Sequence, residues 1–250
     1  MVKFNGIFEP TARHIRVKFG GEIVADSRNV MLMIESAYEM NYYFPEKDVR
    51  MDLLKQSDQS ENSGYKGKSI HWHVNVGGKI AENAAWSFVE DKEKRPDLRG
   101  MIAFQWDVMD SWHEEDEQVF GHARSPYHRV DTIQSSRNIR VELDGVTVAE
   151  SKRPMLLFET GLPTRYYIPL EDIIQDYLKP SDSQTICPYK GFASYWSLQV
   201  NGQSHQDLAW YYSEPYPESA KIGGLVSFYN EKLDIYVDGE LEQKAKTVWS

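Results

Sequence analysis

The sequence predicts a mainly β protein built from two tandem homologous domains of antiparallel sheets. The chain from Arg13 to Glu117 aligns with the chain from Arg137 to Leu241 without a gap, and about thirty of roughly a hundred aligned positions are identical. Within each copy, apolar and polar residues alternate with the period of two that half-buried strands show. Glycine-containing pairs between these stretches are typical of tight hairpin turns. Each copy is about 105 residues long, enough for a core of its own.

Each copy begins with four expected strands in the same order. The first two are joined by a hairpin turn at Gly20-Gly21 or Asp144-Gly145. Pro45 and Pro169 follow the fourth strand and end it, because proline has no N–H for a strand ladder. The expected strands are Ile15–Phe19, Ile23–Ser27, Met31–Glu35 and Tyr42–Phe44 in the first copy, and Ile139–Leu143, Thr147–Ser151, Met155–Glu159 and Tyr166–Ile168 in the second.

One short helix is expected after the fourth strand of each copy. In the second copy the apolar residues follow the spacing of one helix face, and two acidic residues stand in its first turn. The apolar residues are Leu170, Ile173, Ile174, Tyr177 and Leu178. A central loop and strand, a hairpin at Gly78 or Gly202, and a strand carrying Trp86 or Trp210 follow. A last hairpin joins Leu225–Tyr229 to Asp234–Val237.

Three segments lie outside the two repeats. Residues 1–12 are expected to form an irregular strap, and residues 242–250 a C-terminal tail. Residues 118–136 connect the copies and are aromatic and charged rather than rich in Gly and Ser, so we expect a docked segment and not a floppy linker. Together the copies would form a pseudo-dimer within one chain.

The bulk composition excludes several classes of function. A formal net charge of -10 argues against a nucleic-acid partner, whose phosphates need a basic surface. No stretch of the sequence is apolar for long enough to predict a membrane span. One cysteine cannot form an internal disulfide or a cysteine-built zinc site. We therefore expect a cytoplasmic protein without a bound cofactor or metal, whose partner is a small molecule.

The central strand of each copy has two different faces. Trp196 points to one side with the apolar residues that follow it, and Tyr195 to the other. The tryptophan face is apolar in both copies, so Trp72 and Trp196 are predicted to lie in the cores, with Trp86 and Trp210. The opposite face is polar and differs between the copies, since His71 replaces Tyr195. It is either a ligand-facing surface or a solvent-facing one.

His71 and His73 stand on one face of the first copy's central strand. They could share a metal or act as acid and base near pH 7. No third ligand is adjacent, so a metal site is not predicted. Glu35 and Glu159, which close equivalent apolar strands, are weaker candidates for carboxylate chemistry.

The triplet Tyr-Lys-Gly precedes both central strands, as Tyr65–Gly67 and Tyr189–Gly191. The glycine suits a turn that needs a positive φ, and a lysine beside an aromatic can bind an anion or, if desolvated, act as a base. A solvated lysine is the simpler interpretation. Cys187 could be a nucleophile only with a base nearby, and a packed thiol explains it as well.

Four strings in this sequence together resemble the family known as domain of unknown function 427, in its tandem form. They are Tyr42–Leu54, Cys187–Ser197, Phe228–Asp234 and the connecting Pro126–Asp131. The family has been labelled nucleotidyltransferase-like, but the resemblance brings no established activity. It implies a β-tent-like fold of two antiparallel sheets meeting at an angle, in which a pocket between the sheets can hold small or ring-shaped ligands. The sequence departs from the family pattern at Ser69–His73, where both histidines are unusual.

Two functions follow as hypotheses. The first is an enzyme acting without a cofactor, by acid–base chemistry, on a small polar or ring-bearing metabolite. The second is a non-catalytic binding module with an aromatic pocket, and a pseudo-symmetric interaction scaffold is also open. Nucleotidyl transfer fits least, because no glycine-rich phosphate loop accompanies the carboxylates.

We place the expected site in the second copy, where both Cys-Pro and Tyr-Trp-Ser are kept. His128 would be the general acid or base, because it titrates near neutrality. The expected catalytic residues are His128, Tyr189 and Lys190. The expected ligand-binding residues are Arg129, Tyr167, Cys187 and Tyr195 in and near the second copy, and Tyr65, Lys66, His71 and His73 in the first.

Overall fold

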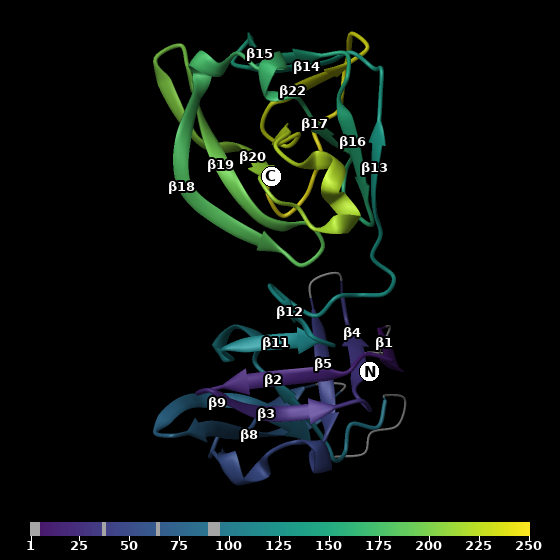
Figure 1. The fold of residues 1–250 in the computed structure, drawn as a ribbon, viewed down its shortest axis with the longest axis vertical. Coiled ribbons are helices and arrows are strands. Elements are labelled where there is room, and N and C mark those ends of the chain that lie inside the picture. The colour runs from purple at the N-terminus through teal and green to yellow at the C-terminus, as the bar shows by residue number, and fades with distance from the viewer. Residues whose placement is uncertain (1–5, 37–38, 64–65, 90–95) are drawn as a thin grey trace. The chain divides into compact units, whose positions relative to one another are not determined.

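The computed structural model describes residues 6–36, 39–63, 66–89 and 96–250. The chain divides into a first unit, residues 1–125, and a second unit, residues 126–250 (Figure 1). Each unit is a set of antiparallel strands with short turns of 3-10 helix, so the predicted mainly β class in two tandem halves is confirmed. No helix in these described ranges is long and apolar enough to cross a membrane.

The first unit contains a long sheet and a smaller one. The long sheet has the order β1 (Ile7–Pro10), β4 (Met31–Ile34), β5 (Met40–Pro45), β10 (Met101–Phe104), β9 (Lys79–Phe88), β8 (Gly67–Val76) and β6 (Leu54–Gln56), with β7 (Asn62–Ser63) also paired to β8. The smaller sheet has the order β12 (Glu117–Val119), β11 (Ser111–Glu114), β2 (Ile15–Phe19) and β3 (Glu22–Ser27).

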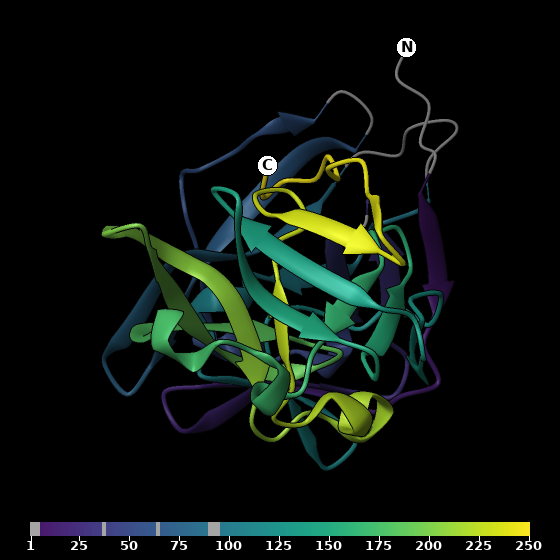
Figure 2. The same cartoon turned by 90° about the horizontal axis from the view of Figure 1, so that it is seen from above.

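The second unit repeats this order strand for strand. Its long sheet runs β13 (Val130–Gln134), β16 (Met155–Glu159), β17 (Arg165–Tyr167), then β21 (Val226–Phe228), β20 (Gln203–Tyr212), β19 (Gly191–Val200) and β18 (Leu178–Cys187). A bridge between Ile168 and Val226 joins its two parts. The smaller sheet runs β15 (Val146–Ser151), β14 (Ile139–Leu143), β22 (Asp234–Val237) and β23 (Glu240–Leu241); its β14–β22 pair is seen from above in Figure 2.

The predicted hairpin turns are confirmed in both units. Gly20 and Gly21 have φ of 60° and 85°, and Asp144 and Gly145 have φ of 51° and 76°. Two successive residues with positive φ form the type of turn that matches the twist of a two-residue hairpin. At Gly20 there is also no room for a side chain, because an added Cβ would lie 2.8 Å from Cβ of Val76.

The strap and the connecting segment both contain regular structure. Residues 7–10 were expected to be irregular, but they form β1 and pair with β4. The connecting segment contributes β13 in the same way, because residues 130–134 pair with β16. Each repeat therefore starts with an edge strand that the alternation of apolar residues did not predict. None of the residues of β1 or β13 is fully buried, so the period of two is not visible in these strands. Whether residues 118–136 dock between the units stays a prediction.

The predicted amphipathic helix is not a single helix. Two 3-10 turns, η4 (Leu170–Asp172) and η5 (Gln175–Tyr177), stand at that place. Between them Ile173 is extended, with φ of -111° and ψ of 139°, and it bridges to Ala149 of β15. Burial of Ile173 against the smaller sheet interrupts the helix, and Ile174 is left 46% exposed. The apolar residues have the spacing of a helix face, but Ile173 is buried because it pairs with a strand. The first unit repeats the pattern in η1 (Glu46–Asp48) and η2 (Met51–Leu53).

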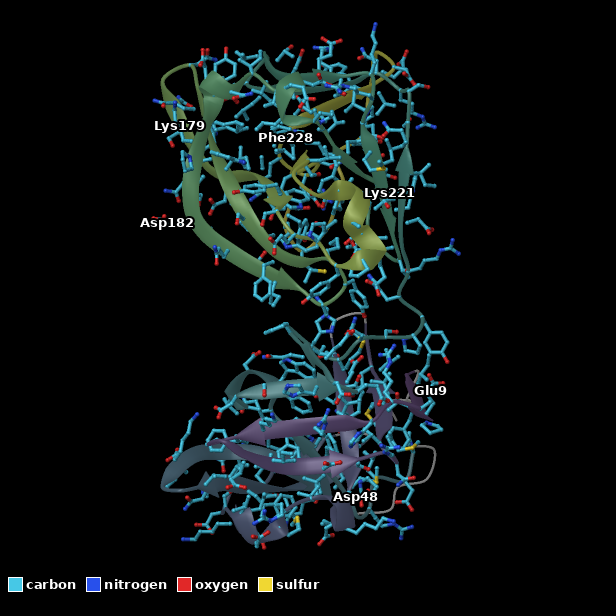
Figure 3. The ribbon with its side chains drawn as sticks, viewed as in Figure 1. Glu9, Asp48, Lys179, Asp182, Lys221 and Phe228 are labelled. Atoms are coloured by element: carbon cyan, nitrogen blue, oxygen red, sulfur yellow. The ribbon has the colours of Figure 1, made fainter. Side chains whose placement is uncertain are left out.

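The apolar residues of each unit form two clusters, one on either face of the long sheet. In the second unit Leu198 and Val200 belong to the larger cluster, whereas Ala193 belongs to the other. Figure 3 shows Phe228 inside this unit and Lys179, Asp182 and Lys221 at its outside. Tyr195 packs against the cluster of Ala193. The face opposite Trp196 is thus neither purely solvent-facing nor purely ligand-facing, because a second core covers part of it.

A bulge that both units share lies in the central strand pair. The register shifts between Trp72 and Val74 on β8, and between Trp196 and Leu198 on β19. Asn83 and Asp207, on the partner strands, have φ of 53° and 55° at this point. An irregular residue bends a strand and redirects the side chains beyond it. The bulge places two successive residues of the partner strand in the same cluster, Ala84 and Ala85 in the first unit and Leu208 and Ala209 in the second.

The four tryptophans differ in burial. Trp210 is 8% exposed and donates its indole N–H to the hydroxyl of Tyr167 at 3.0 Å. Trp72, Trp86 and Trp196 pack against the clusters but are only half-buried. The predicted core position is confirmed for Trp210, and the other three lie at the edge of a core.

This difference predicts unequal effects of truncation. We expect Trp210→Ala to lower the free energy of unfolding by about 3–5 kcal/mol, because it empties a buried site and leaves Tyr167 without its donor. Trp196→Ala should cost clearly less, since part of that ring already contacts water. Urea unfolding followed by far-ultraviolet circular dichroism measures both. An equal loss in the two variants would contradict the assigned burial.

Candidate functional site

An ion pair between a lysine and a glutamate is repeated in both units, partly buried in the first and more deeply buried in the second. In the first unit Lys66 donates to Oε2 of Glu35 at 2.7 Å. In the second, Lys190 donates to Oε2 of Glu159, and both side chains are at most 10% exposed. The lysines precede β8 and β19, whereas Glu35 directly follows β4 and Glu159 is the last residue of β16. This pair joins two distant parts of the sheet, which explains why Lys and Glu occur at the same positions in both copies.

In the second unit Glu159 has a second partner. His128 lies with Nε2 3.0 Å from Oε1 of Glu159, and the ring of Tyr189 stacks on the imidazole at 3.9 Å. Burial acts to raise the pKa of Glu159, but the hydrogen bond with His128 and the charge of Lys190 outweigh it, so the pKa is lowered. We call His128, Glu159, Tyr189 and Lys190 the Glu159 site. The three predicted catalytic residues thus come together around a carboxylate that was only a weak candidate.

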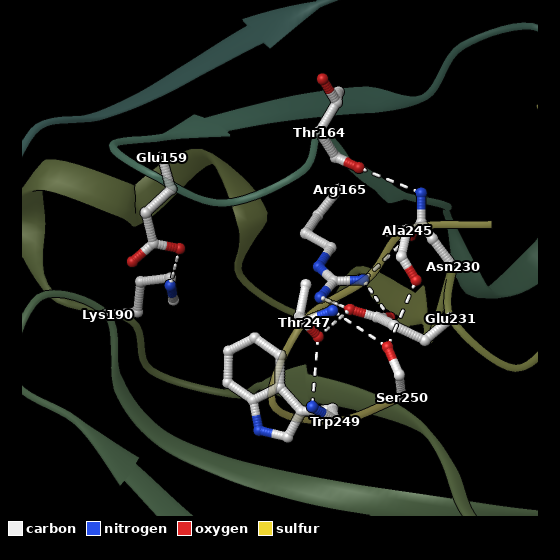
Figure 4. A network of polar contacts seen from close by, with 10 residues as sticks. All are labelled: Glu159, Thr164, Arg165, Lys190, Asn230, Glu231, Ala245, Thr247, Trp249 and Ser250. Carbon is white, nitrogen blue, oxygen red and sulfur yellow. Dashed lines mark hydrogen bonds and ion pairs between the residues drawn. The ribbon is translucent and has the colours of Figure 1, made fainter. Parts of the chain in front are cut away.

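The geometry defines what this site can do. Glu159 accepts a hydrogen bond from Nε2 of His128, which leaves Nδ1 as the ring nitrogen that can take up a proton. Lys190 is held by the same carboxylate (Figure 4), so it is an anchor more than a free cation.

The other predicted residues of the second unit lie in different surroundings. Tyr195 exchanges a hydrogen bond with Thr185 at 2.8 Å, and Cys187 is half-buried. Burial raises the pKa of Tyr167, which is 1% exposed. Arg129 is directed away from this set, because its side chain is 79% exposed and its Nε lies 2.8 Å from Asp131. Tyr167 is therefore a core residue, and Arg129 a surface residue.

Sequence reasoning missed a buried arginine in the second unit. Arg165 makes a bidentate pair with Glu231, with distances of 2.7 and 2.8 Å, and both side chains are almost fully buried (Figure 4). The rings of Trp210, Tyr229 and Trp249 lie within 6.0 Å of the guanidinium. The first copy has Asn41 at the aligned position, so the internal repeat carried no signal for it.

The first unit contains an open pocket of about 610 Å³ beside the repeated bulge. Its wall combines amide, carboxylate and imidazole groups with two aromatic rings. The lining residues are Gln59, Glu61, Lys66, Ser69, His71, Glu82, Asn83, Trp86, Phe88 and Gln105. We call this the first-unit pocket. Lys66 and His71, both predicted to bind ligand, are part of it.

The same positions in the second unit carry larger side chains. Tyr195 stands where the first unit has His71, and Tyr229 where it has Gln105. The two tyrosines interact, and the ring of Tyr229 also packs on Trp210 with 4.6 Å between centroids. Two substitutions of an aromatic by a smaller polar residue thus account for the open space in the first unit.

His73 has a different role from His71. Its Nδ1 accepts the backbone N–H of Asn83 at 3.2 Å, and Ser197 accepts the N–H of Asp207 at 3.3 Å in the second unit. His73 therefore bonds the backbone N–H at the bulge, and it is not among the residues that line the pocket. Tyr65, also predicted to bind ligand, lies outside the described residues. Among the residues with described positions, no three His, Cys, Asp or Glu side chains come together as a metal site.

These features define a tandem mainly β protein with one repeated framework, a polar pocket in its first unit and a buried carboxylate site in its second. The sequence profile of the domain of unknown function DUF427 matches the chain twice, over residues 7–115 and 131–239. The protein therefore belongs to the DUF427 family, as a tandem member. No curated protein matches the chain.

The lowered pKa of Glu159 predicts how the stability of the fold depends on pH. Its lowered folded pKa means that it stabilises the fold fully above its unfolded pKa of about 4.3, and that this stabilisation is lost as the pH falls from that value through the lower folded pKa. Glu159→Gln leaves Lys190 without a counter-ion and should cost about 3 kcal/mol at pH 7.

The difference between wild type and Glu159→Gln should therefore shrink on acidification from pH 7 to pH 3. Urea unfolding at both pH values measures it. Glu218→Gln, at an exposed glutamate, is the matched control and should change little at either pH. A gap that stays constant with pH would show that Glu159 is not charged in the folded protein.

Proposed function

We propose that the protein binds a small, polar, ring-bearing molecule in the first-unit pocket. The observation that carries this proposal is the pocket itself, with about 610 Å³ of space against two aromatic rings and several polar groups. Ligand sites in proteins are typically concave, of a few hundred Å³, and combine apolar walls with a few placed polar groups. Of the functions that the sequence leaves open, the binding module has the stronger support.

The framework supports binding more than it supports chemistry at this place. The Lys66–Glu35 pair and the bulge at Asn83 fix the two ends of the pocket wall, so little ordering is needed when a ligand enters. Trp86 is half-buried in the wall, which leaves part of its ring for stacking. The pocket is thus preorganised for a flat molecule.

Filling the pocket should abolish binding without harming the fold. His71→Tyr introduces the residue that the second unit already accommodates at the aligned position, and so it should be tolerated. Its matched control is Tyr195→His, which opens the second unit and leaves the first unchanged. Ring-bearing fragments are screened by ¹H–¹⁵N NMR, with the indole N–H of Trp86 as the reporter.

We expect fragments to shift the Trp86 signal in the wild type and in Tyr195→His, but not in His71→Tyr. Trp86→Phe identifies the signal. Fragments that bind equally well to His71→Tyr, or only to the second unit, would contradict the proposal. A metabolite that co-purifies with the wild type and is lost from His71→Tyr would support it directly.

A second candidate function is acid–base catalysis at the Glu159 site. The observation in its favour is the His128–Glu159 contact at 3.0 Å, in which a buried carboxylate orients a partly exposed imidazole. This arrangement is used by general acids and bases, whose ring must be held in one tautomer. A cofactor is not needed for such proton transfer.

Proton abstraction by His128 would leave an isotopic trace. A mixture of small metabolites incubated with the protein in D₂O should gain deuterium in one component, and His128→Gln should prevent the gain. Arg129→Gln, at the exposed neighbour, is the control and should keep the activity. Equal labelling with His128→Gln would remove the catalytic candidate and leave the binding proposal unaffected.

A further inference from the structure

We infer that the first-unit pocket selects a flat ring that carries a cationic, hydrogen-bond-donating group, such as an amidine or a protonated amino-heterocycle. The inference rests on the proposed function and adds the chemical class of the ligand. It follows from the charges, the unpaired acceptors and the rings of the pocket wall.

The charge balance of the wall is negative. Glu61 and Glu82 both line the pocket, and Lys66 is its one lysine or arginine among the lining residues. Lys66 is already held by Glu35 at 2.7 Å, so its charge is compensated inside the wall. An anionic ligand would have to compete with Glu35 for Lys66 and would face two carboxylates. A cation meets a favourable potential instead.

The second observation is a buried acceptor without a partner. His71 is 8% exposed, and its Nε2 lies 2.9 Å from Oγ of Ser69. The hydroxyl of Ser69 donates to the carbonyl of Glu61, so it accepts from Nε2–H of His71. Nδ1 of His71 is then a lone-pair acceptor, and it has no hydrogen-bond partner among the described residues.

Asn83 provides a second acceptor of the same kind. Its Oδ1 is also buried without a hydrogen-bond partner in the described part of the chain, and it belongs to a residue of the pocket wall. An unsatisfied buried acceptor costs free energy that a suitable donor recovers. Both unpaired acceptors can accept a hydrogen bond from a ligand. Amidines and amino-heterocycles share the N–H donors that such bonds require.

The aromatic part of the wall suits a cationic ring. Trp86 is half-buried and lines the pocket, and Phe88 lies 5.8 Å from Nζ of Lys66. Aromatic faces attract cations, and a delocalised planar cation both stacks and interacts with the ring quadrupole. Shape, charge and hydrogen bonding thus favour the same class of ligand.

Three probes of the same shape separate the contribution of the ligand's charge from that of its ring. Benzamidine, benzamide and benzoate carry the same ring with a cationic, a neutral and an anionic group. Each is titrated into the full-length protein, with the indole N–H of Trp86 as the reporter. We expect benzamidine to bind at least about tenfold more tightly than benzamide, and benzoate to bind most weakly.

Variants assign the selectivity to the wall. Glu82→Gln and Glu61→Gln should each weaken benzamidine several-fold and leave benzamide nearly unchanged, whereas Glu218→Gln should affect neither. His71→Tyr should remove binding of all probes.

Each failure has its own signature. Benzoate or benzamide binding at Trp86 as tightly as benzamidine would overturn the inference and leave the proposed function standing. No response of Trp86 to any of the three probes would overturn the inference, and the fragment screen then decides the proposed function separately.

Discussion

The bulge in the central strand pair is the constraint on which the rest of each unit depends. A residue with positive φ, Asn83 or Asp207, breaks the register of the pair, and the backbone N–H that it frees is bonded by the side chain opposite, His73 or Ser197. Without the bulge, successive residues of the partner strand would alternate between the two faces of the long sheet. With it, two successive residues, Ala84 and Ala85 or Leu208 and Ala209, belong to the same cluster. Glu82 and Asn83 of the bulge are part of the lining of the first-unit pocket.

Duplication preserved this framework and changed what it encloses. The Lys-Glu pair, the bulge and the tryptophan on the neighbouring strand are present in both units. Where the second unit has Tyr195 and Tyr229, the first has His71 and Gln105. An aromatic pair stabilises by burial and ring contact, whereas the smaller polar residues leave space and unpaired acceptors. Smaller side chains at these two positions accompany the open pocket of the first unit, and the contact of His128 with Glu159 is a feature of the second unit.

The candidate sites were partly visible in the sequence. Tyr189, Lys190 and His128 were singled out from the repeat and the connecting segment, and they do meet, because Glu159 binds both Lys190 and His128, on which Tyr189 stacks. The role of Glu159 itself was underrated, since one glutamate at the end of an apolar strand resembles many others. Arg165 was missed because it has no counterpart in the first copy. His71 and His73 were treated as equivalent. In the structure they have different partners, because His73 accepts the backbone N–H of Asn83 at the bulge, whereas His71 is bonded to Ser69.

The sequence by itself determined the duplication, the antiparallel strands and most of the hairpin turns. These features depend on local rules, namely the period of two along a strand and the positive φ that glycine and aspartate tolerate at a turn. The tertiary structure decided the short helices, the edge strands and the place of the pocket. The spacing of Leu170 to Leu178 fits a helix, yet Ile173 gains more by pairing with Ala149 of a distant strand. Likewise, no local pattern shows that His71 and Gln105 line the same pocket, because strands far apart in the chain must pair to bring them to it.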